Sequence, residues 1–231
     1  MIRLKTYKYQ MHTHTTMCSK CADMTSKQLI ESLVAGGYSG CVLTNHFFKG
    51  NSNINRNLPW NDFVAFYEND YLECKKLAQK HDLDIIFGVE EHLFDGLEIL
   101  CYGITPQFFY DNPVLKNDHS IETWSAALHN FGALCIQAHP FRDRNYISNP
   151  RLLPCEYIDG IEVFNYCNEP HENILAANAA KEHPNWVLVS GADTHSANLV
   201  CNAGIESNIK ITNEKTLVSV LKSGDYKLIV G

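Results

Sequence analysis

The chain has 231 residues, of which 45% are hydrophobic and 19% are charged. These values are typical of one globular domain with a full hydrophobic core, and they exclude a fibrous or disordered chain. The formal net charge is −7, from 26 acidic and 19 basic residues. Such a chain lacks the basic surface that sequence-independent nucleic-acid binding requires, so stable nucleic-acid binding is not expected.

The nine cysteines are odd in number and scattered along the chain, which argues against a disulfide framework. Four lie in or beside apolar runs, where a free cysteine behaves as a small buried hydrophobe: Cys41, Cys101, Cys135 and Cys201. No signal peptide is recognised, and no apolar run approaches the roughly 20 residues that a membrane span needs. The sequence predicts a cytoplasmic protein with no membrane association, and it leaves the oligomeric state open.

Short β-rich runs alternate with helical segments along the chain. A strand near Lys5–Met11 precedes a capping box at Thr25–Gln28, which opens a helix that ends at Gly36 and Gly37. A buried strand follows at Cys41–Thr44. The same cycle predicts further helices over residues 61–80, 121–131 and 171–182. The other predicted strands are Asp84–Val89, Leu97–Tyr102, Ala133–Ala138, Ile158–Phe164, Trp186–Gly191, Ile209–Ile211 and Tyr226–Val230.

This alternation predicts an α/β fold in which a parallel sheet is covered by helices, within a single domain over residues 1–231. Polar, ionisable residues stand at the ends of many strands. A closed or nearly closed barrel of the TIM type brings such ends to one rim, whereas a doubly wound open sheet spreads them across its width. The barrel is therefore favoured. The polar loops 48–60 and 105–119 are candidates for covering its mouth, and plain surface loops are the alternative.

Five histidines occur at the ends of predicted strands. The motifs His12-x-His14 and Asp193-x-His195 each place two side chains on one strand face, because residues i and i+2 of a strand point to the same side. The other members of the pattern are His46, Glu90 and His139. Imidazoles and carboxylates that converge in this way suit divalent transition metals better than hydrophobic packing does. The pattern therefore predicts a metallohydrolase.

A serine hydrolase is the nucleophilic alternative, because Ser190 and Ser196 flank Asp193 and His195. The chain has no G-x-S-x-G elbow. In addition, an aspartate and a histidine that share one strand face are not placed to orient each other. This alternative is discounted.

With these motifs in place, the chain resembles the PHP (polymerase and histidinol phosphatase) family over nearly its whole length. The resemblance rests on HTHT at 12–15, LTNH at 43–46, GVE at 88–90, AHPFR at 138–142, IEVFN at 161–165 and GADTH at 191–195. Each motif is weak alone, but six in family order and spacing are a strong signal. The resemblance implies a distorted (β/α)7 barrel that uses two or three divalent metal ions (Zn, Mn or Fe) to hydrolyse phosphoric esters.

The resemblance also implies a ligand for each metal position. The residues that match the ligands of the first metal are His12, His14, Glu90 and Asp193. Glu90 also matches the carboxylate that bridges to a second metal, whose other ligands include His139. Glu90 is preferred to Glu91 because it directly follows Gly-Val at a strand end. His46 and His195 match ligands of a third metal.

Three departures from the family pattern bear on the metals. Glu98 stands where the family often has a histidine, and a carboxylate there would favour manganese or iron. Asp23 is the expected third-site ligand, with Cys18 and Cys21 as alternatives. These two cysteines could also form half a zinc site or a redox pair, although a packed loop with two thiols is the simpler interpretation. Asn45 stands where aspartate is more usual.

The expected activity is hydrolysis of a small phosphate ester by a metal-activated hydroxide at a di- or trinuclear centre. Glu90 would bridge the metals, Arg142 would bind the substrate phosphate and neutralise charge, Asn165 would hydrogen-bond the substrate, and His195 could protonate the leaving group. Candidate substrates are a phosphomonoester (histidinol-phosphate-like, a sugar phosphate or a phosphotyrosine) and a short nucleotide. The alternative is a metal-binding module without turnover.

Five other histidines lie in polar or helical contexts and are expected at the surface: His81, His119, His129, His171 and His183. For His119 and His171, the alternative to a surface position is a position at the mouth of the barrel.

Overall fold

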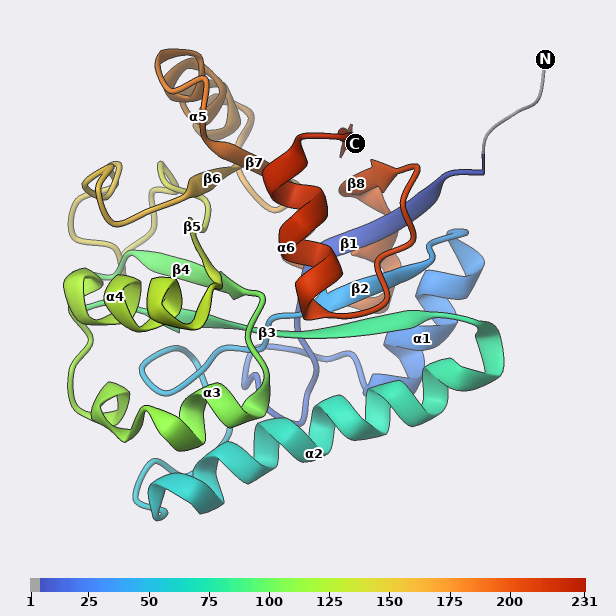
Figure 1. The fold of residues 1–231 in the computed structure, drawn as a ribbon, viewed down its shortest axis with the longest axis horizontal. Coiled ribbons are helices and arrows are strands. Elements are labelled where there is room, and N and C mark those ends of the chain that lie inside the picture. Colours follow the sequence, from blue (N-terminus) through green and yellow to red (C-terminus); the bar gives the residue numbers. More distant parts are fainter. Residues whose placement is uncertain (1–4) are drawn as a thin grey trace.

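The computed structural model describes residues 5–231, apart from the side chain of Cys201. In this part of the chain nine strands form one sheet, in the order β7-β6-β5-β4-β3-β2-β1-β8-β9 (Figure 1). The strands are β1 Tyr7–Thr13, β2 Gly40–Leu43, β3 Asp84–His92, β4 Glu98–Tyr102, β5 Leu134–Gln137, β6 Gly160–Asn165, β7 Val187–Gly191, β8 Ala203–Ser207 and β9 Tyr226–Val230.

The sheet curls into a nearly closed barrel, because its two ends meet. Strand β7 packs against β1, β8 and β9. Thr13 at the end of β1 pairs with Thr194 just after β7, and the Ser190 hydroxyl of β7 donates to the Ile229 carbonyl of β9. The predicted fold class, a single α/β domain with a distorted barrel, is confirmed.

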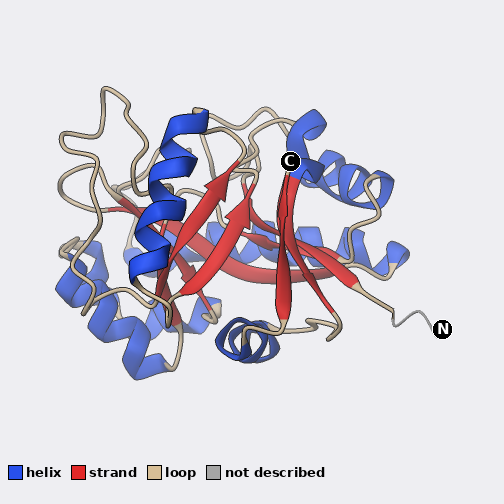
Figure 2. Ribbon diagram, turned by 90° about the horizontal axis from the view of Figure 1, so that it is seen from above, coloured by secondary structure: helices blue, strands red, loops and turns tan. Residues whose placement is uncertain are grey.

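Helices surround the strands (Figure 2). They are α1 Ser26–Ala35, α2 Trp60–Ala78, α3 Pro106–Asp111, α4 Ile121–Phe131, α5 Pro170–Glu182 and α6 Glu214–Ser223, with short 3-10 turns at Gln79–His81, Pro113–Lys116 and Ala197–Asn202. Helix α1 begins with the predicted capping box, in which Thr25 and Gln28 each accept from the other's backbone. Among the described residues, no helix has both the length and the apolar character needed to cross a membrane.

Strand β3 shows how alternation divides the apolar residues into two cores. Ile86 faces the barrel interior, where it joins apolar residues of the other strands and of α6. Ile85, Phe87 and Val89 face outward into a larger core beneath the surrounding helices. Because side chains alternate along a strand, Glu90 continues the inward face of Ile86.

Strand β4 differs from the predicted parallel arrangement, because it runs antiparallel to both β3 and β5. A tight turn joins β3 to β4, in which the Leu93 N–H donates to the Leu97 carbonyl at 2.8 Å. Such a turn reverses the chain, whereas a parallel neighbour would need a long crossover. The first residue of β4, Glu98, consequently lies opposite His92 at the carboxyl end of β3.

The predicted strand at Ile209–Ile211 is wrong, and the strand in this region is β8 at Ala203–Ser207. Ile211 is fully buried in the barrel interior, and its N–H donates to the Tyr9 hydroxyl rather than to a neighbouring strand. Ile211 is therefore apolar because it is buried in the core, not because it belongs to a strand. The predicted strand at Tyr226–Val230 is present as β9.

The two predicted mouth loops have different positions. Residues 105–119 contain α3 and a 3-10 turn, and α3 packs against α2 with Phe108 and Phe109 fully buried, so this segment is not a lid. Residues 48–60 approach the mouth through Lys49 and Arg56. The buried position predicted for Cys41, Cys101 and Cys135 is confirmed, and the side chain of Cys201 lies outside the described part.

Candidate metal centre

The carboxylate of Glu90 lies at the centre of a buried cluster at the carboxyl ends of the strands. Its Oε1 is 3.2 Å from His12 Nε2 and 3.1 Å from His139 Nε2. Its Oε2 is 2.8 Å from His46 Nδ1 and 3.5 Å from His14 Nε2. Four imidazoles from three different strand ends thus surround one carboxylate that is fully buried.

The first group of donor atoms contains His12, His14, Glu90 and Asp193, all within 4.8 Å of one another. Asp193 Oδ1 lies 3.4 Å from His12 Nε2 and 3.2 Å from His14 Nε2. Ligands bound to one ion at about 2.0–2.2 Å lie about 3 to 3.5 Å apart, so these separations suit a common cation. These are the four residues that the resemblance implied for the first metal.

A second group contains His46, Glu90 and Glu98. Glu98 Oε2 is also 3.4 Å from His139 Nε2, so Glu90 and Glu98 face the same imidazole. Glu90 belongs to both the first and the second group, as a bridging carboxylate would. Glu98 reaches this position because β4 is antiparallel and begins at the rim.

A third group contains His14, His46 and His195. The Nε2 atoms of His46 and His195 are 3.5 Å apart. The structure thus brings together eight of the nine residues predicted as metal ligands: seven belong to these three groups, and His139 contacts Glu90 and Glu98. The Asp23 side chain is exposed and belongs to none of the groups. Near His195, Asp23 contributes only its backbone N–H, which donates to the His195 carbonyl.

Buried polar atoms without hydrogen bonds test whether this cluster fits a metal. Four such atoms occur in the described part of the chain, and three lie in the cluster: His12 Nε2, His46 Nδ1 and Glu90 Oε2. The atoms of His46 and Glu90 are 2.8 Å apart but are not aligned as donor and acceptor. Since unpaired buried polar atoms are costly, three that converge on one spot fit a cation-binding position.

Opposing charges set the titration of this cluster. Burial disfavours the charged form of His12, but Asp193 and Glu90 outweigh it and raise the pKa of His12 well above its usual value. Burial likewise opposes ionisation of Glu90, but His12 and His46 lower the pKa of Glu90 well below its usual value. Burial, together with the neighbouring His195 and His46, lowers the pKa of His14. A proton on the His12 ring therefore occupies a position that a cation would take over.

Two of the cluster residues have unusual backbone conformations. His139 has φ of 25° and Asp193 has φ of 51°, in the left-handed region that side chains other than glycine seldom adopt. Strain of this kind persists where the surrounding structure imposes it, and it concentrates at functional sites. Here it turns each side chain inward at the point where its strand ends.

Gln10 shapes the strand that carries His12 and was missed in the sequence. The pairing of β1 with β2 shifts between Gln10 and Thr13, so that the strand bulges at the first histidine of the motif. The side-chain oxygen Oε1 of Gln10 accepts from the N–H groups of Met11, His12 and Ala192. Gln10 follows the polar segment KTYKY in the sequence, and nothing there indicated that its side chain would be buried and would accept these hydrogen bonds.

Glu162 was also missed, although a charged residue inside the apolar run GIEVF was a usable signal. Its Oε1 is 3.0 Å from His12 Nδ1, and its Oε2 accepts from the His139 N–H at 3.1 Å. A carboxylate that accepts from the ring nitrogen not bound to metal fixes the tautomer and orientation of a ligating imidazole. Gly191 makes room for this contact, because a Cβ there would collide with Glu162 and His12.

Arg142 and Asn165, predicted to contact the substrate, mainly support Asp193 in this structure. Arg142 Nη1 is 2.6 Å from Asp193 Oδ2, its Nη2 donates to Asn165 and its Nε donates to Asn168. The Asn165 amide in turn donates to Glu162 and, at 3.4 Å, to Asp193. The guanidinium still lines the pocket, but its donors are engaged with the protein.

The unusual Asn45 belongs to a buried polar network behind His14. Its side-chain oxygen accepts from Ser19 Oγ, which also lies 3.1 Å from His14 Nδ1. Its amide donates to the Asp70 carboxylate of α2 at 2.7 Å. An aspartate at position 45 would face Asp70 as a second buried carboxylate, so the amide is explained by its partner.

Glu91 faces away from the cluster, as the preference for Glu90 requires. It accepts from the backbone N–H groups of Phe48 and Lys49, and it lies 3.4 Å from His119 Nδ1. His119 is 2% exposed, so its predicted surface position is wrong. The reason is tertiary, since the ring stacks on Phe48 and pairs with a buried acid.

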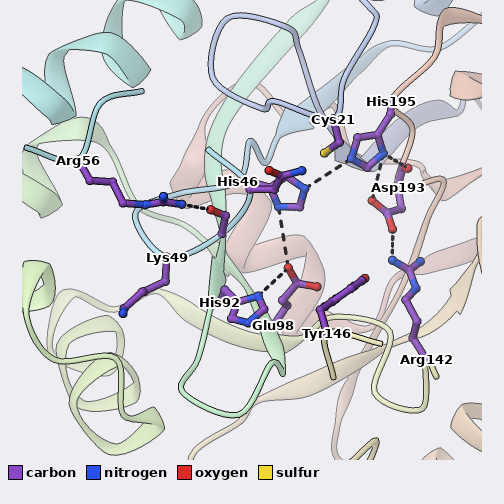
Figure 3. A pocket seen from close by; sticks show the side chains of 12 residues that line it. Cys21, His46, Lys49, Arg56, His92, Glu98, Arg142, Tyr146, Asp193 and His195 are labelled. Carbon is purple, nitrogen blue, oxygen red and sulfur yellow. Dashed lines mark hydrogen bonds and ion pairs between the residues drawn. The ribbon is translucent and has the colours of Figure 1, made fainter. Parts of the chain in front are cut away.

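The cluster opens into a pocket of about 560 Å³ (Figure 3). His46, Asp193 and His195 line its inner side, and Lys49 and Arg56 from the loop after β2 line another part. Cys21, His92 and Tyr146 complete the wall. A pocket of this size suits a small-molecule ligand or part of a larger one.

The fold and the cluster together describe a barrel protein that carries histidines and carboxylates at the carboxyl ends of its strands. Neither the protein-family models nor the curated proteins contain a match. Solved structures do match. A two-domain protein from Bacteroides vulgatus, which contains a predicted PHP-like metal-dependent phosphoesterase, has a TM-score of 0.72 at 13% identity, over 98% of this chain and 65% of that chain.

Two other structures extend this comparison. A chain from Bifidobacterium adolescentis, provisionally assigned as a metal-dependent phosphoesterase, has a TM-score of 0.58 at 15% identity, over 92% of this chain and 95% of that chain. The lesion-specific endonuclease EndoQ from Pyrococcus furiosus has a TM-score of 0.62 at 13% identity, over 97% of this chain and 58% of that chain. Endonuclease Q has also been solved with a 27-mer duplex whose abasic lesion lies at the active site. The chain therefore has the fold of PHP-like phosphoesterases, as its six motifs indicated.

Proposed function

We propose that this chain is a metal-dependent phosphoric ester hydrolase with a di- or trinuclear centre. The observation that carries the proposal is the position of Glu90, whose two oxygens face imidazoles from separate strands at 2.8 to 3.5 Å. The unpaired buried atoms around it and the fold of the similar structures support the same conclusion. Zinc, manganese and iron are the candidate metals.

The proposed ligands are His12, His14, Glu90 and Asp193 for one ion and Glu90, Glu98 and His139 for a second, with His46 and His195 beside them. When bound, the ions would activate a water and neutralise charge on the phosphate oxygens. Glu162 and Arg142 would hold His12 and Asp193 in ligating orientations. The ligands and the residues that orient them are thus separate groups.

The sequence suggested His195 as the proton donor for the leaving group, but the geometry favours a different residue. His195 Nδ1 donates to the Asp193 carbonyl at 2.9 Å, and its Nε2 faces His46, which favours ligation over proton donation. His92 lines the same pocket and is only partly buried. A hydrogen bond to the Glu98 carboxylate raises the pKa of His92, so this ring holds a proton at neutral pH more readily than free histidine does.

The proposed substrate is a small phosphate ester, either a phosphomonoester or a short nucleotide. The size of the pocket and the net charge of −7 support this choice. The Lys49 ammonium on the pocket wall offers a cation for an anionic substrate group. The second candidate is a nucleic acid that presents one nucleotide to the pocket, and the likeness to EndoQ favours it.

One experiment separates these functions. The full chain is stripped with a chelator, reloaded with Zn²⁺, Mn²⁺ or Fe²⁺, and assayed on phosphomonoesters, nucleoside bisphosphates and duplexes with an abasic site. Turnover that appears only after reloading supports the hydrolase, and the preferred class names the substrate. Metal uptake without turnover on any of these esters would favour the alternative of a metal-binding module.

A further inference from the structure

An aromatic ring, that of Tyr146, lies on the wall of the pocket that opens from the metal cluster (Figure 3). Tyr146 is 51% exposed. Of the large hydrophobic residues that are exposed in the described part of the chain, it alone lines this pocket, and the other lining residues are small, polar or ionisable. Exposed aromatic rings in ligand pockets are favourable contacts for apolar or planar groups.

The loop that carries Tyr146 covers residues 138–159, between β5 and β6, and contains neither a helix nor a strand. Loops of this length without secondary structure are uncommon, and many have a functional role. Glu172 of α5 holds the part before Tyr146. Its Oε1 accepts from the Asp143 N–H at 2.7 Å and lies 2.8 Å from Arg144 Nη1. The loop is therefore fixed to the barrel on this side.

The turn between β3 and β4 holds the part of the loop at and after Tyr146. The Asp95 carbonyl accepts from the Ser148 N–H at 3.3 Å, and Ile147 is buried. Gly96 has φ of 87°, and a Cβ there would lie 2.3 Å from the Tyr146 carbonyl oxygen, so the two backbones are in close contact. The Tyr146 ring is thus exposed although its backbone is held on both sides. A side chain on a held backbone is in position before the ligand binds.

The Tyr146 ring also lies close to the metal cluster. Its centroid is 6.2 Å from that of the His92 ring, and the two planes are tilted by 41°. His92 Nδ1 is 3.4 Å from Glu98 Oε1, and Glu98 Oε2 is 3.4 Å from His139 Nε2. Figure 3 shows the ring between the side chains of Glu98 and Arg142. A phosphate at the cluster therefore has the group that it esterifies within reach of Tyr146.

We propose that Tyr146 is a specificity-determining residue, which stacks on an aromatic ring in the leaving group of the substrate. This inference deepens the proposed function and rests on it, because it requires a phosphate ester bound at the metal cluster. Stacking on an aromatic side chain tolerates different rings, since each presents a π face. The ring is that of a nucleobase or of a phenyl group. Sugar phosphates have no such ring, and Tyr146 selects against them.

Two matched pairs of ligands test the proposal in the full chain loaded with metal. Adenosine 5′-monophosphate and ribose 5-phosphate share a phosphorylated ribose, and only the first has a base. Phenyl phosphate and glycerol 3-phosphate differ in the same way by a phenyl ring. The wild type should have a lower KM for the ring-bearing member of at least one pair, and that pair identifies the ring. Where a ligand is not cleaved, its dissociation constant from calorimetry replaces KM.

Two substitutions of Tyr146 separate the ring from the hydroxyl. Tyr146→Leu should raise the KM of the ring-bearing ligand about tenfold and leave that of its ring-free partner unchanged. Tyr146→Phe keeps the ring and should keep the preference of the wild type. Tyr166→Leu is the matched control, because Tyr166 is 39% exposed but lines a separate groove beside α5. This variant should also keep the preference.

Three outcomes would overturn the role of Tyr146 in specificity and leave the metal-dependent hydrolase intact. They are equal KM values within both pairs in the wild type, an equal change for both members of a pair in Tyr146→Leu, and a loss in Tyr146→Phe as large as that in Tyr146→Leu. A loaded chain that cleaves no phosphate ester would instead contradict the proposed function. In that case the dissociation constants still decide whether Tyr146 binds the ring.

Discussion

The barrel interior contains two regions of opposite chemistry built from the same strands. Toward one end, inward side chains such as Ile86 of β3 and Leu100 of β4 are apolar and pack with α6. Toward the other end, Glu90 and Glu98 occupy the corresponding inward positions of those two strands and join the histidine cluster. Glu90 lies four positions after Ile86 on β3, and Glu98 lies two positions before Leu100 on β4, so a short length of strand separates the hydrophobic core from the candidate metal centre.

The two regions differ in what stabilises them. The apolar region gains free energy from burial, at about 25 cal/mol per Å² of apolar surface. The ionisable region buries charged groups at a cost, offset by their mutual pairing and, in our proposal, by bound cations. Substitutions in the first region should therefore change stability and spare metal binding, and substitutions in the second should do the reverse.

The largest effect is expected for Glu90→Gln, which removes the charge that both donor groups share. We expect kcat/KM to fall roughly 10³-fold or more, together with a loss of bound metal. Glu91→Gln is the matched control, because Glu91 faces the outer side of the same strand and contacts His119. If Glu90→Gln kept its full metal content and activity, the bridging role of this carboxylate would be wrong.

Leu100→Ala probes the apolar region. Leu100 is fully buried in the interior core, so the variant should lose about 2–5 kcal/mol of unfolding free energy through lost burial and a residual cavity. Its metal stoichiometry should match that of the wild type. Chemical unfolding and metal analysis of the same preparation measure both quantities, and a drop in metal content would contradict the separation of the two regions.

Asn45→Asp tests the network that joins the cluster to α2. A carboxylate in place of the amide would oppose Asp70 at close range, where the amide now donates at 2.7 Å. We expect a loss of about 2 kcal/mol of stability at neutral pH, which shrinks in acid as one carboxyl becomes protonated. The double variant Asn45→Asp with Asp70→Asn should recover much of the loss. Equal stability of the single variant and the wild type would show that the network tolerates two acids.

Arg142→Gln separates support of a ligand from binding of the substrate. Because the guanidinium pairs with Asp193, we expect metal affinity to fall about 10- to 100-fold, with a smaller change in KM at saturating metal. Arg144→Gln is the control, since Arg144 pairs with Glu172 instead. A raised KM with unchanged metal affinity would restore the role in substrate binding that the sequence suggested.

Local patterns explain why much of the site could be predicted. His12-x-His14 and Asp193-x-His195 follow from the two-residue period of strands, and Glu90 was distinguished from Glu91 by its place at a strand end. The structure brings these residues together with His46 and His139. Their role as metal ligands stays a prediction until metal is measured.

Other residues depend on partners that are distant in the sequence. Gln10 supports a bulge by accepting from Ala192, and Glu162 orients His12 from across the barrel. His119 looked like a surface residue because its partner, Glu91, lies 28 positions earlier in the chain. Periodicity within one segment carries no information about such pairs.

Local periodicity in the sequence was enough to predict the alternation of strands and helices, the inward faces of the strands and most of the residues that gather at the rim. The direction of β4, which brings Glu98 to the rim, the burial of Ile211 without strand pairing, and the exposure of the Asp23 side chain became evident from the three-dimensional structure alone. Strand direction and loop placement depend on contacts between distant segments, and these contacts form only when the barrel closes.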